Sequence, residues 1–283
     1  MNETFLDYRA DWRKFATTMF KLEDADPGYV LLKRAKVPRM QKLRFVLAWC
    51  AFYNVGVAAV ASTYQGAEFY QYLRHVYPTA KRNSERRHFR GQAGLKALHQ
   101  WQTAYPVPEE MVESCYSSTY MGVRKNMLGM AQMGDYFYWK LADVWDTVFD
   151  QPVDFTGCEK YMPKVPKQGA EMIMAMDRKD YYHALVSGEE LEWVMRRVTN
   201  HIRPLRYGLK HPRKLELQEA ETVCCVFKQH VVGDYKFGFR SAKAFKRLNA
   251  HAHESRVVLK YLDGLYAGGI WNRERLLEVG EHL

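Results

Sequence analysis

The amino-acid sequence predicts an all-α protein, on three observations. Apolar residues recur at helical spacing through most of the 283 residues, no segment alternates as a strand does, and the breaks are short. With 47% hydrophobic residues the chain can bury one core or two closely packed lobes, so we expect a single α-helical domain over residues 1–283. The expected helices are residues 5–22, 42–64, 67–76, 85–104, 109–116, 124–130, 136–149, 169–176, 189–198, 215–231, 241–250, 255–266 and 273–281, with breaks at 26–28, 77–83, 105–108, 161–168 and 201–213.

Charge and cysteine content narrow the class of protein. Forty-two Lys and Arg against 32 Asp and Glu give a net charge of +10 and a pI near 9.2, which suits an anionic partner such as nucleic acid. The five cysteines are odd in number and form no C-x-x-C pair. We therefore expect a reducing compartment and no zinc or iron–sulfur site. The N-terminal residues show no series of charged, apolar and cleavage-site residues, so we expect no secretory signal.

The expected helix at residues 42–64 contains an uncharged stretch, residues 45–64, that is about long enough to span a bilayer. Its central Asn54 and scattered Tyr, Ser and Thr favour a buried helix of a helical protein over a membrane span. Tyr53 of this stretch belongs to an aromatic set that can stack on an extruded base, although aromatics at helical spacing are more often core. The set is Tyr53, Tyr64, Tyr136, Tyr138 and Trp139.

The run SERRHFRG concentrates positive charge at the start of the next long helix. It places Arg86, Arg87 and Arg90 within about one turn, and three guanidinium groups can hold a phosphate or pyrophosphate. A solvated helix face is the alternative interpretation.

Residues 133–155, MGDYFYWKLADVWDTVFDQPVDF, predict a helix-hairpin-helix followed by a positioned aspartate. A helix ends near Met130, a turn follows at Gly134 and Asp135, and a second helix carries apolar residues at helical spacing. Backbone N–H groups at such a turn and at a helix N-terminus stabilise a phosphate, so we expect Gly134, Tyr136 and Lys125 to contact a DNA backbone. The hairpin is thus placed at residues 130–149.

Two features inside and after this hairpin carry charge. Lys140 and Asp143 lie at i and i+3 on the second helix, which is typical of an ordinary surface ion pair and is of more interest if the pair is buried. After that helix Pro152 limits continuation, so Asp154 falls at a loop or at a new helix start.

The last chemical patch is the segment EAETVCCVFKQHVVGDYKFG at residues 219–238. One helix face carries Glu221, Cys225 and Lys228 at i, i+4 and i+7, which offers an acid, a thiol and an amine. A loop flanked by glycines follows and contains Tyr235. Packing is the alternative explanation for Cys225 and its neighbour Cys224, because a free cysteine is often a small buried hydrophobe.

These motifs resemble known families. The hairpin followed by Pro-Val-Asp is similar to the helix-hairpin-helix DNA glycosylases, in which this aspartate, here Asp154, is the catalytic carboxylate. Bifunctional members carry a nucleophilic lysine where this chain has Tyr136, so Schiff-base lyase chemistry is not expected there. The order DPGYVLLKRA, ERRHFRG, GDYFYWKLADVWD, PVDF and ETVCCVFK with GDYKFG, within residues 26–247, resembles the phage alpha-glutamyl/putrescinyl thymine pyrophosphorylase clade, the amino acid:DNA transferases.

The resemblance implies an all-α, DNA-glycosylase-like catalytic domain that extrudes its target base and acts in the cytoplasm of the infected bacterial host. A separate kinase converts 5-hydroxymethyluracil in DNA to a 5-phosphomethyl or 5-pyrophosphomethyl form, and this enzyme replaces the phosphate group with the amine of a free amino acid or polyamine. Departure of phosphate leaves an intermediate that resembles an exocyclic methylene, which a neutral amine attacks. No motif for a nucleotide, flavin, pyridoxal or metal cofactor is present, so we expect no cofactor.

Hypotheses for individual residues follow from this reaction. Asp154 orients or deprotonates the amine, Lys228 with Arg87 and Arg90 neutralises the leaving phosphate, and Tyr235 shapes the base pocket. Arg86 and Tyr53 are further candidates for substrate binding. Lys140 and Asp143 bind the amino-acid zwitterion or only brace the hairpin. Addition of a Cys225 thiolate to C6 of the pyrimidine is an alternative activation.

Two alternative functions stay open. A monofunctional DNA glycosylase would use Asp154 to stabilise an oxocarbenium-like sugar and would release a free base, leaving an abasic site. A non-catalytic helical DNA-binding protein would use the hairpin and the arginine cluster alone, and Asp154→Asn would then leave its activity intact.

Overall fold

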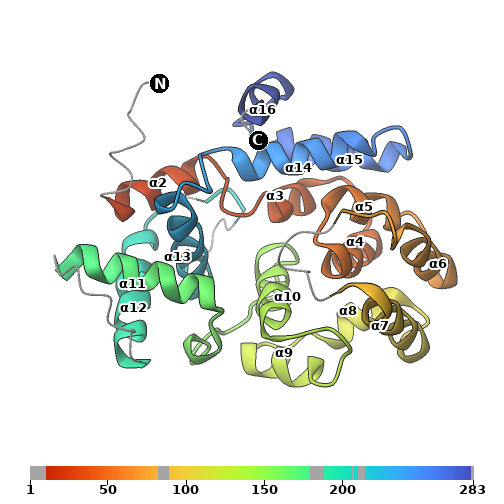
Figure 1. Ribbon diagram of the computed structural model, residues 1–283, viewed down its shortest axis with the longest axis horizontal. Coiled ribbons are helices and arrows are strands. Elements are labelled where there is room, and N and C mark those ends of the chain that lie inside the picture. The colour runs from red at the N-terminus through yellow and green to blue at the C-terminus, as the bar shows by residue number, and fades with distance from the viewer. Residues whose placement is uncertain (1–10, 82–88, 179–187, 206, 210–213, 282–283) are drawn as a thin grey trace. The chain divides into compact units, whose positions relative to one another are not determined.

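The computed structural model describes residues 11–81, 89–178, 188–205, 207–209 and 214–281. Within these residues the secondary structure is helical, with no strand, which confirms the all-α prediction (Figure 1). The chain divides into two compact units, each built from separate stretches of sequence. Unit 1 comprises residues 1–26 and 154–240, and unit 2 comprises residues 27–153 and 241–283.

Unit 1 is organised around two helices that approach unusually closely, α11 and α13. Gly169 of α11 makes this approach feasible, because a Cβ atom there would lie 1.9 Å from the carbonyl oxygen of Cys224 in α13. Helix α12 packs against both of them, and α2 packs against α12 and α13. The helices of unit 1 are α2 (Trp12–Lys21), η2 (Glu159–Tyr161), α11 (Lys164–Arg178), α12 (Gly188–Ile202) and α13 (Leu217–Val231).

Unit 2 has the almost fully buried α4 at its centre, in contact with α5 and α8. Helix α15 packs on α3 and α5, and Gly264 lets it approach the backbone at Leu31. The helices of unit 2 are α3 (Pro27–Arg34), α4 (Arg39–Phe52), α5 (Val55–Ala61), α6 (Gly66–Val76), α7 (Gly91–Ala104), α8 (Pro108–Ser114), α9 (Tyr120–Met127), α10 (Asp135–Thr147), α15 (Arg256–Tyr266) and α16 (Arg273–Gly280), with α14 (Phe239–Ala250) beginning two residues before its second stretch.

The expectation of one helix over residues 42–64 is wrong. Helix α4 ends at Phe52 because Tyr53 adopts a left-handed conformation with φ of 50°. Asn54 then starts α5, since its side chain accepts hydrogen bonds from the backbone N–H groups of Gly56 and Val57. Among the helices of the described residues, none is both long and apolar enough to span a membrane.

Four of the expected breaks contain helical residues. Helix α3 begins at Pro27, inside the break expected at 26–28, and α11 begins at Lys164, inside the break expected at 161–168. Helix α8 begins at Pro108, inside the break expected at 105–108, and α12 ends at Ile202, inside the break expected at 201–213. Proline is tolerated in the first turn of a helix, where its missing N–H leaves no bond unmade, so Pro27, Pro108 and Pro166 mark helix starts. Helix α7 begins at Gly91 because Arg90 has an extended backbone, and residues 85–88 of the helix expected at 85–104 lie outside the described residues.

The expected hairpin corresponds to α9 and α10, which are consecutive and pack together. Helix α9 ends at Met127, earlier than expected near Met130, and α10 begins at Asp135 with Gly134 as its N-terminal cap residue. An ion pair of 3.2 Å between Arg124 Nε and Asp135 Oδ1 joins the two helices. Assignment of this pair to the helix-hairpin-helix class, and of the chain to a DNA-glycosylase-like fold, stays a prediction.

Candidate functional site

Asp154 opens the second stretch of unit 1, with an exposed side chain between the buried Val153 and Phe155. Its Oδ1 atom accepts hydrogen bonds from the hydroxyl of Thr156 at 2.6 Å and from the Thr156 backbone N–H at 2.9 Å. These two bonds, the hydroxyl first, lower the pKa of Asp154 below its ordinary value of 3.8. The carboxylate is therefore ionised at neutral pH and held in one orientation.

Helix α13 carries the expected stripe of Glu221, Cys225 and Lys228. Glu221 is buried, whereas Cys225 and Lys228 are half-buried. The other four cysteines are buried, and burial raises the pKa of the Cys224 thiol well above its ordinary value. Packing thus explains Cys224, while Cys225 keeps partial access to solvent and accepts a contact of 3.8 Å from the Gln229 amide.

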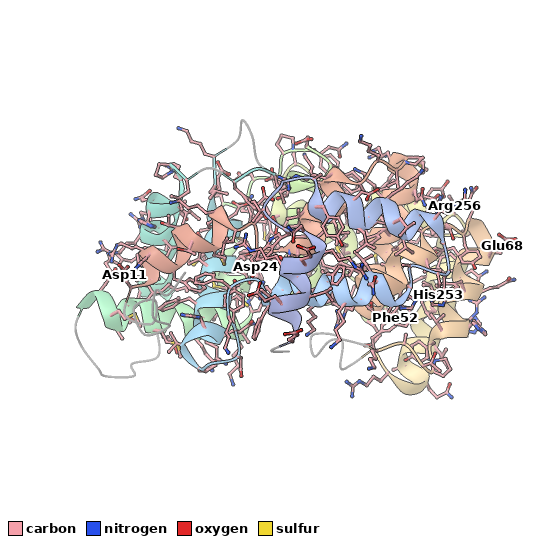
Figure 2. The ribbon with its side chains drawn as sticks, turned by 90° about the horizontal axis from the view of Figure 1, so that it is seen from above. Asp11, Asp24, Phe52, Glu68, His253 and Arg256 are labelled. Carbon is pink, nitrogen blue, oxygen red and sulfur yellow. The ribbon has the colours of Figure 1, made fainter. Side chains whose placement is uncertain are left out.

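Tyr235 is buried and hydrogen-bonded to Asp24, a residue that the sequence analysis did not identify as a candidate. Its hydroxyl donates to Asp24 Oδ2 at 2.6 Å, and the backbone N–H of Gly238 donates to the same oxygen at 2.8 Å. Arg240 reaches the same segment, because its Nη1 donates to the carbonyl oxygen of Ala25 at 2.7 Å. Asp24, labelled in Figure 2, is buried and so anchors the loop that follows α13. Burial, with the Asp24 charge, raises the pKa of Tyr235 well above its ordinary value.

In unit 2, Lys140 and Asp143 are both buried on α10, so the surface ion-pair interpretation is wrong. The Lys140 ammonium lies 5.3 Å from the centre of the Tyr29 ring, a cation–π contact. Asp143 Oδ1 accepts a hydrogen bond of 3.1 Å from the hydroxyl of Thr147. Buried charged groups are rare and need partners, so these two residues remain candidates for substrate binding or for bracing α10.

The five residues of the expected aromatic set do not form one cluster. Tyr53 and Tyr136 lie together, with ring centroids 5.9 Å apart, and Tyr53 stacks on Trp49 at 4.9 Å. The Tyr53 carbonyl oxygen accepts a hydrogen bond of 2.8 Å from Arg247 Nη1. The other three lie elsewhere: Tyr64 stacks on Tyr72, Tyr138 donates to the Met133 carbonyl oxygen, and the buried Trp139 packs on Tyr120.

The remaining candidates are placed only in part. Arg86 and Arg87 lie outside the described residues, and Arg90 is exposed at the start of α7. Lys125 is exposed in the last turn of α9, and Gly134 precedes α10 with an extended backbone. In the described part of the chain, no group of three or more His, Cys, Asp or Glu side chains is arranged to hold a metal ion.

Comparison with known proteins identifies the family. The family model of amino acid:DNA transferases matches residues 7–236. A glycinyltransferase of Pseudomonas phage PaMx11 is 27% identical over 246 residues, which cover 78% of this chain and 84% of that protein. A putrescinyltransferase of Delftia phage PhiW-14 is 29% identical over 241 residues, which cover 81% of this chain and 76% of that protein. Because the family model matches most of its length, the chain belongs to the amino acid:DNA transferase family.

Proposed function

We propose that this protein transfers the amine of an amino acid or polyamine onto 5-phosphomethyl- or 5-pyrophosphomethyl-deoxyuridine in DNA and displaces phosphate or pyrophosphate. The match of the family model over residues 7–236 is the observation that carries the proposal. The two relatives support it, since one is named for transfer of glycine and the other for transfer of putrescine. Extrusion of the target base from the duplex is part of the proposal, at a cost of about a few kcal/mol.

The reaction exchanges one bond at the exocyclic carbon of the base. The amine lone pair forms the new C–N bond, the C–O bond to the phosphate group breaks, and the phosphate oxygen keeps that electron pair. The amine nitrogen then loses one proton. An enzyme for this reaction has to hold a neutral amine in place, stabilise the positive charge that develops on nitrogen, and bind the departing anion.

Asp154 suits the first two of these tasks. A general base works best when its pKa is near the operating pH, whereas the pKa of Asp154 is lowered below 3.8. A carboxylate of that kind removes protons weakly but accepts a hydrogen bond from an amine and stabilises a nearby positive charge. We therefore assign Asp154 to orientation and charge stabilisation of the attacking amine, in preference to its deprotonation.

Lys228 is the proposed partner of the leaving phosphate in unit 1. It is half-buried on α13, and a cation that is partly withdrawn from water interacts more strongly with an anion than an exposed one does. In unit 2, the buried Lys140 and Asp143 carry opposite charges, as binding of an amino-acid zwitterion requires. Bracing of α10 is the alternative role for that pair.

Thr156→Val tests the orientation of Asp154. The change removes the hydroxyl donor at 2.6 Å, keeps the side-chain size and leaves the backbone N–H bond, so the turnover rate should fall roughly fivefold. The pKa of Asp154 is lowered below 3.8 in the wild type, and loss of one hydrogen bond moves it back towards the ordinary value of an aspartate, so its ionisation should cause no loss of rate between about pH 5 and 9 in either protein. Thr156→Ser retains the hydroxyl and should behave as the wild type. Equal rates for the valine variant and the wild type would show that Thr156 does not orient Asp154.

Analysis of nucleosides by mass tests the proposed function itself. The protein is incubated with DNA carrying phosphorylated 5-hydroxymethyluracil and a mixture of amino acids and polyamines, and the DNA is then digested. A nucleoside that has gained one amine, with release of phosphate or pyrophosphate, is the expected result. Free base with abasic sites would instead mean a glycosylase, and unchanged DNA would favour a binding role.

A further inference from the structure

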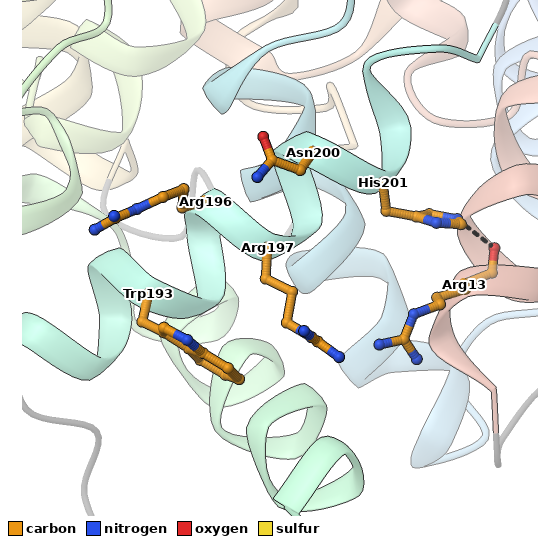
Figure 3. Close-up of a pocket in the computed structure, with 6 residues that line it drawn as sticks. All are labelled: Arg13, Trp193, Arg196, Arg197, Asn200 and His201. Atoms are coloured by element: carbon orange, nitrogen blue, oxygen red, sulfur yellow. Dashed lines mark hydrogen bonds between the residues drawn. The ribbon is translucent and has the colours of Figure 1, made fainter.

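A second candidate surface lies in unit 1, on one face of α12. Trp193, Arg196, Arg197, Asn200 and His201 follow one another at i, i+3, i+4, i+7 and i+8, so they share one side of the helix. Together with Arg13 of α2 they line a surface pocket of about 500 Å³ (Figure 3). Three of its six residues are arginines.

A buried carboxylate fixes two of these arginines. Asp177 of α11 has a side chain that is 7% exposed, and it pairs with Arg13 Nη2 at 2.8 Å through Oδ1 and with Arg197 Nε through Oδ2. The indole N–H of Trp12 also donates to Asp177 Oδ1, at 3.3 Å. Burial raises the pKa of Asp177, but the bonds from Trp12, Arg13 and Arg197 outweigh it and lower the pKa, so the carboxylate stays charged.

This arrangement orients both guanidinium groups and leaves most of their N–H donors available to a ligand. A guanidinium has five N–H donors, and each of the two bonds to Asp177 takes one of them. Arg13 and Arg197 both keep exposed surface. Donors that are already oriented lose less entropy when they bind an anion.

The third arginine, Arg196, can exchange its carboxylate partner for a phosphate. Arg196 Nη2 pairs with Glu192 Oε1 at 3.1 Å, but the two side chains are 67% and 61% exposed. An exposed ion pair of this kind contributes little to stability. Arg196 can therefore exchange Glu192 for a phosphate with little loss of free energy. Trp193 is 37% exposed, and the Arg197 guanidinium lies 5.4 Å from the centre of its ring.

His201 contributes little charge to this pocket. Its Nε2 donates to the carbonyl oxygen of Arg13 at 3.2 Å. Burial lowers the pKa of His201 below its ordinary value of 6.5, so the ring is mostly neutral at pH 7. The positive charge of the pocket therefore comes from its three arginines.

We propose that this arginine pocket, formed by Arg13, Trp193, Arg196, Arg197, Asn200 and His201, binds backbone phosphates of the DNA substrate. The proposal rests on the proposed function insofar as DNA is the substrate. A donor amino acid would need a carboxylate for its ammonium group, and Asp177 is buried and already accepts three donors. Three guanidinium groups beside an exposed tryptophan instead fit a chain of phosphates with a sugar or base against the ring.

Salt-dependent DNA binding tests the pocket without any chemistry. Binding of the full chain to a labelled, unmodified duplex of about 20 base pairs is measured by fluorescence anisotropy at several salt concentrations. Arg196→Gln should weaken binding about fivefold near 0.15 M salt and reduce the slope of log K against log salt by about 0.9, the value for one lost phosphate contact. Glu192→Gln breaks the same ion pair but removes the negative partner, so it should bind DNA at least as tightly as the wild type. Equal weakening by both variants would overturn the proposal.

Arg256→Gln is the control for net charge. Arg256 is exposed at the start of α15, outside the pocket, and is labelled in Figure 2. Its loss should change the affinity less than about twofold and leave the salt slope unchanged. If Arg196→Gln and Arg256→Gln lowered the slope equally, only the overall charge would matter and the pocket would not be the site.

Steady-state kinetics show whether the pocket binds DNA or the amine donor. They also distinguish failure of the pocket proposal from failure of the proposed function. Arg196→Gln should raise the KM for DNA and leave the KM for the amine unchanged. A raised KM for the amine with unchanged DNA binding would assign the pocket to the donor and overturn the proposal. If the wild type binds DNA through Arg196 but yields no aminated nucleoside, the proposed function fails while the pocket stands. If the protein transfers the amine but its DNA binding does not depend on Arg196, the pocket fails while the proposed function stands.

Discussion

Asp154→Asn should lower the rate of amine transfer by about two to four orders of magnitude. The amide has nearly the same shape but lacks the charge that stabilises the nitrogen as the C–N bond forms. Because the Asp154 side chain is exposed, the change should cost the fold less than about 0.5 kcal/mol and leave DNA affinity unchanged. The rate is measured as new nucleoside formed per unit time, with thermal melting and DNA binding recorded on the same protein.

Asp234→Asn is the matched control for this variant. Asp234 is also an exposed aspartate of unit 1, and we assign it no part in the reaction. Its variant should keep the wild-type rate. If Asp154→Asn kept the wild-type rate of amine transfer, Asp154 would have no part in the chemistry and another group would have to orient the amine. If the wild type released free base instead of transferring an amine, and Asp154→Asn lost that release, the result would favour the glycosylase.

Helical periodicity was sufficient to predict the class of this fold but not its breaks. The helix expected at residues 42–64 is two helices, because a single left-handed residue, Tyr53, redirects the chain without changing the apolar pattern. Asn54, a preferred N-cap residue, was the available signal. Pro27 was interpreted as a break, although proline is over-represented at the first position of a helix.

The candidate site was predictable where its signals are local in sequence. Asp154 follows from Pro152 and the end of the preceding helix, and the α13 stripe follows from helical spacing. Asp24 was missed because its partner Tyr235 is 211 residues away, and no spacing rule connects two such positions. The arginine pocket was missed for the same reason, because the face of α12 becomes an anion site only with Arg13 and Asp177 from other helices.

Gly169→Ala should destabilise unit 1 by about 3 kcal/mol or more, which is at the upper end for overpacking. The added methyl group would lie 1.9 Å from the carbonyl oxygen of Cys224 and 2.5 Å from its carbonyl carbon. Both are backbone atoms in the middle of α13, so no side chain can rotate away and α11 and α13 must separate. Calorimetry should record a melting temperature lower by roughly 6–12 °C.

Gly280→Ala separates this clash from the general effect of a glycine substitution. Gly280 is also helical, at the end of α16, and its added methyl group would have its nearest neighbour, the Ala242 Cβ, at 3.9 Å. That is an ordinary contact, so the melting temperature should stay the same or rise slightly. Because α13 carries Lys228 and α11 carries Asp177, separation of the two helices should weaken both transfer and DNA binding. Equal melting of the two variants would mean that Gly169 does not set the distance between α11 and α13.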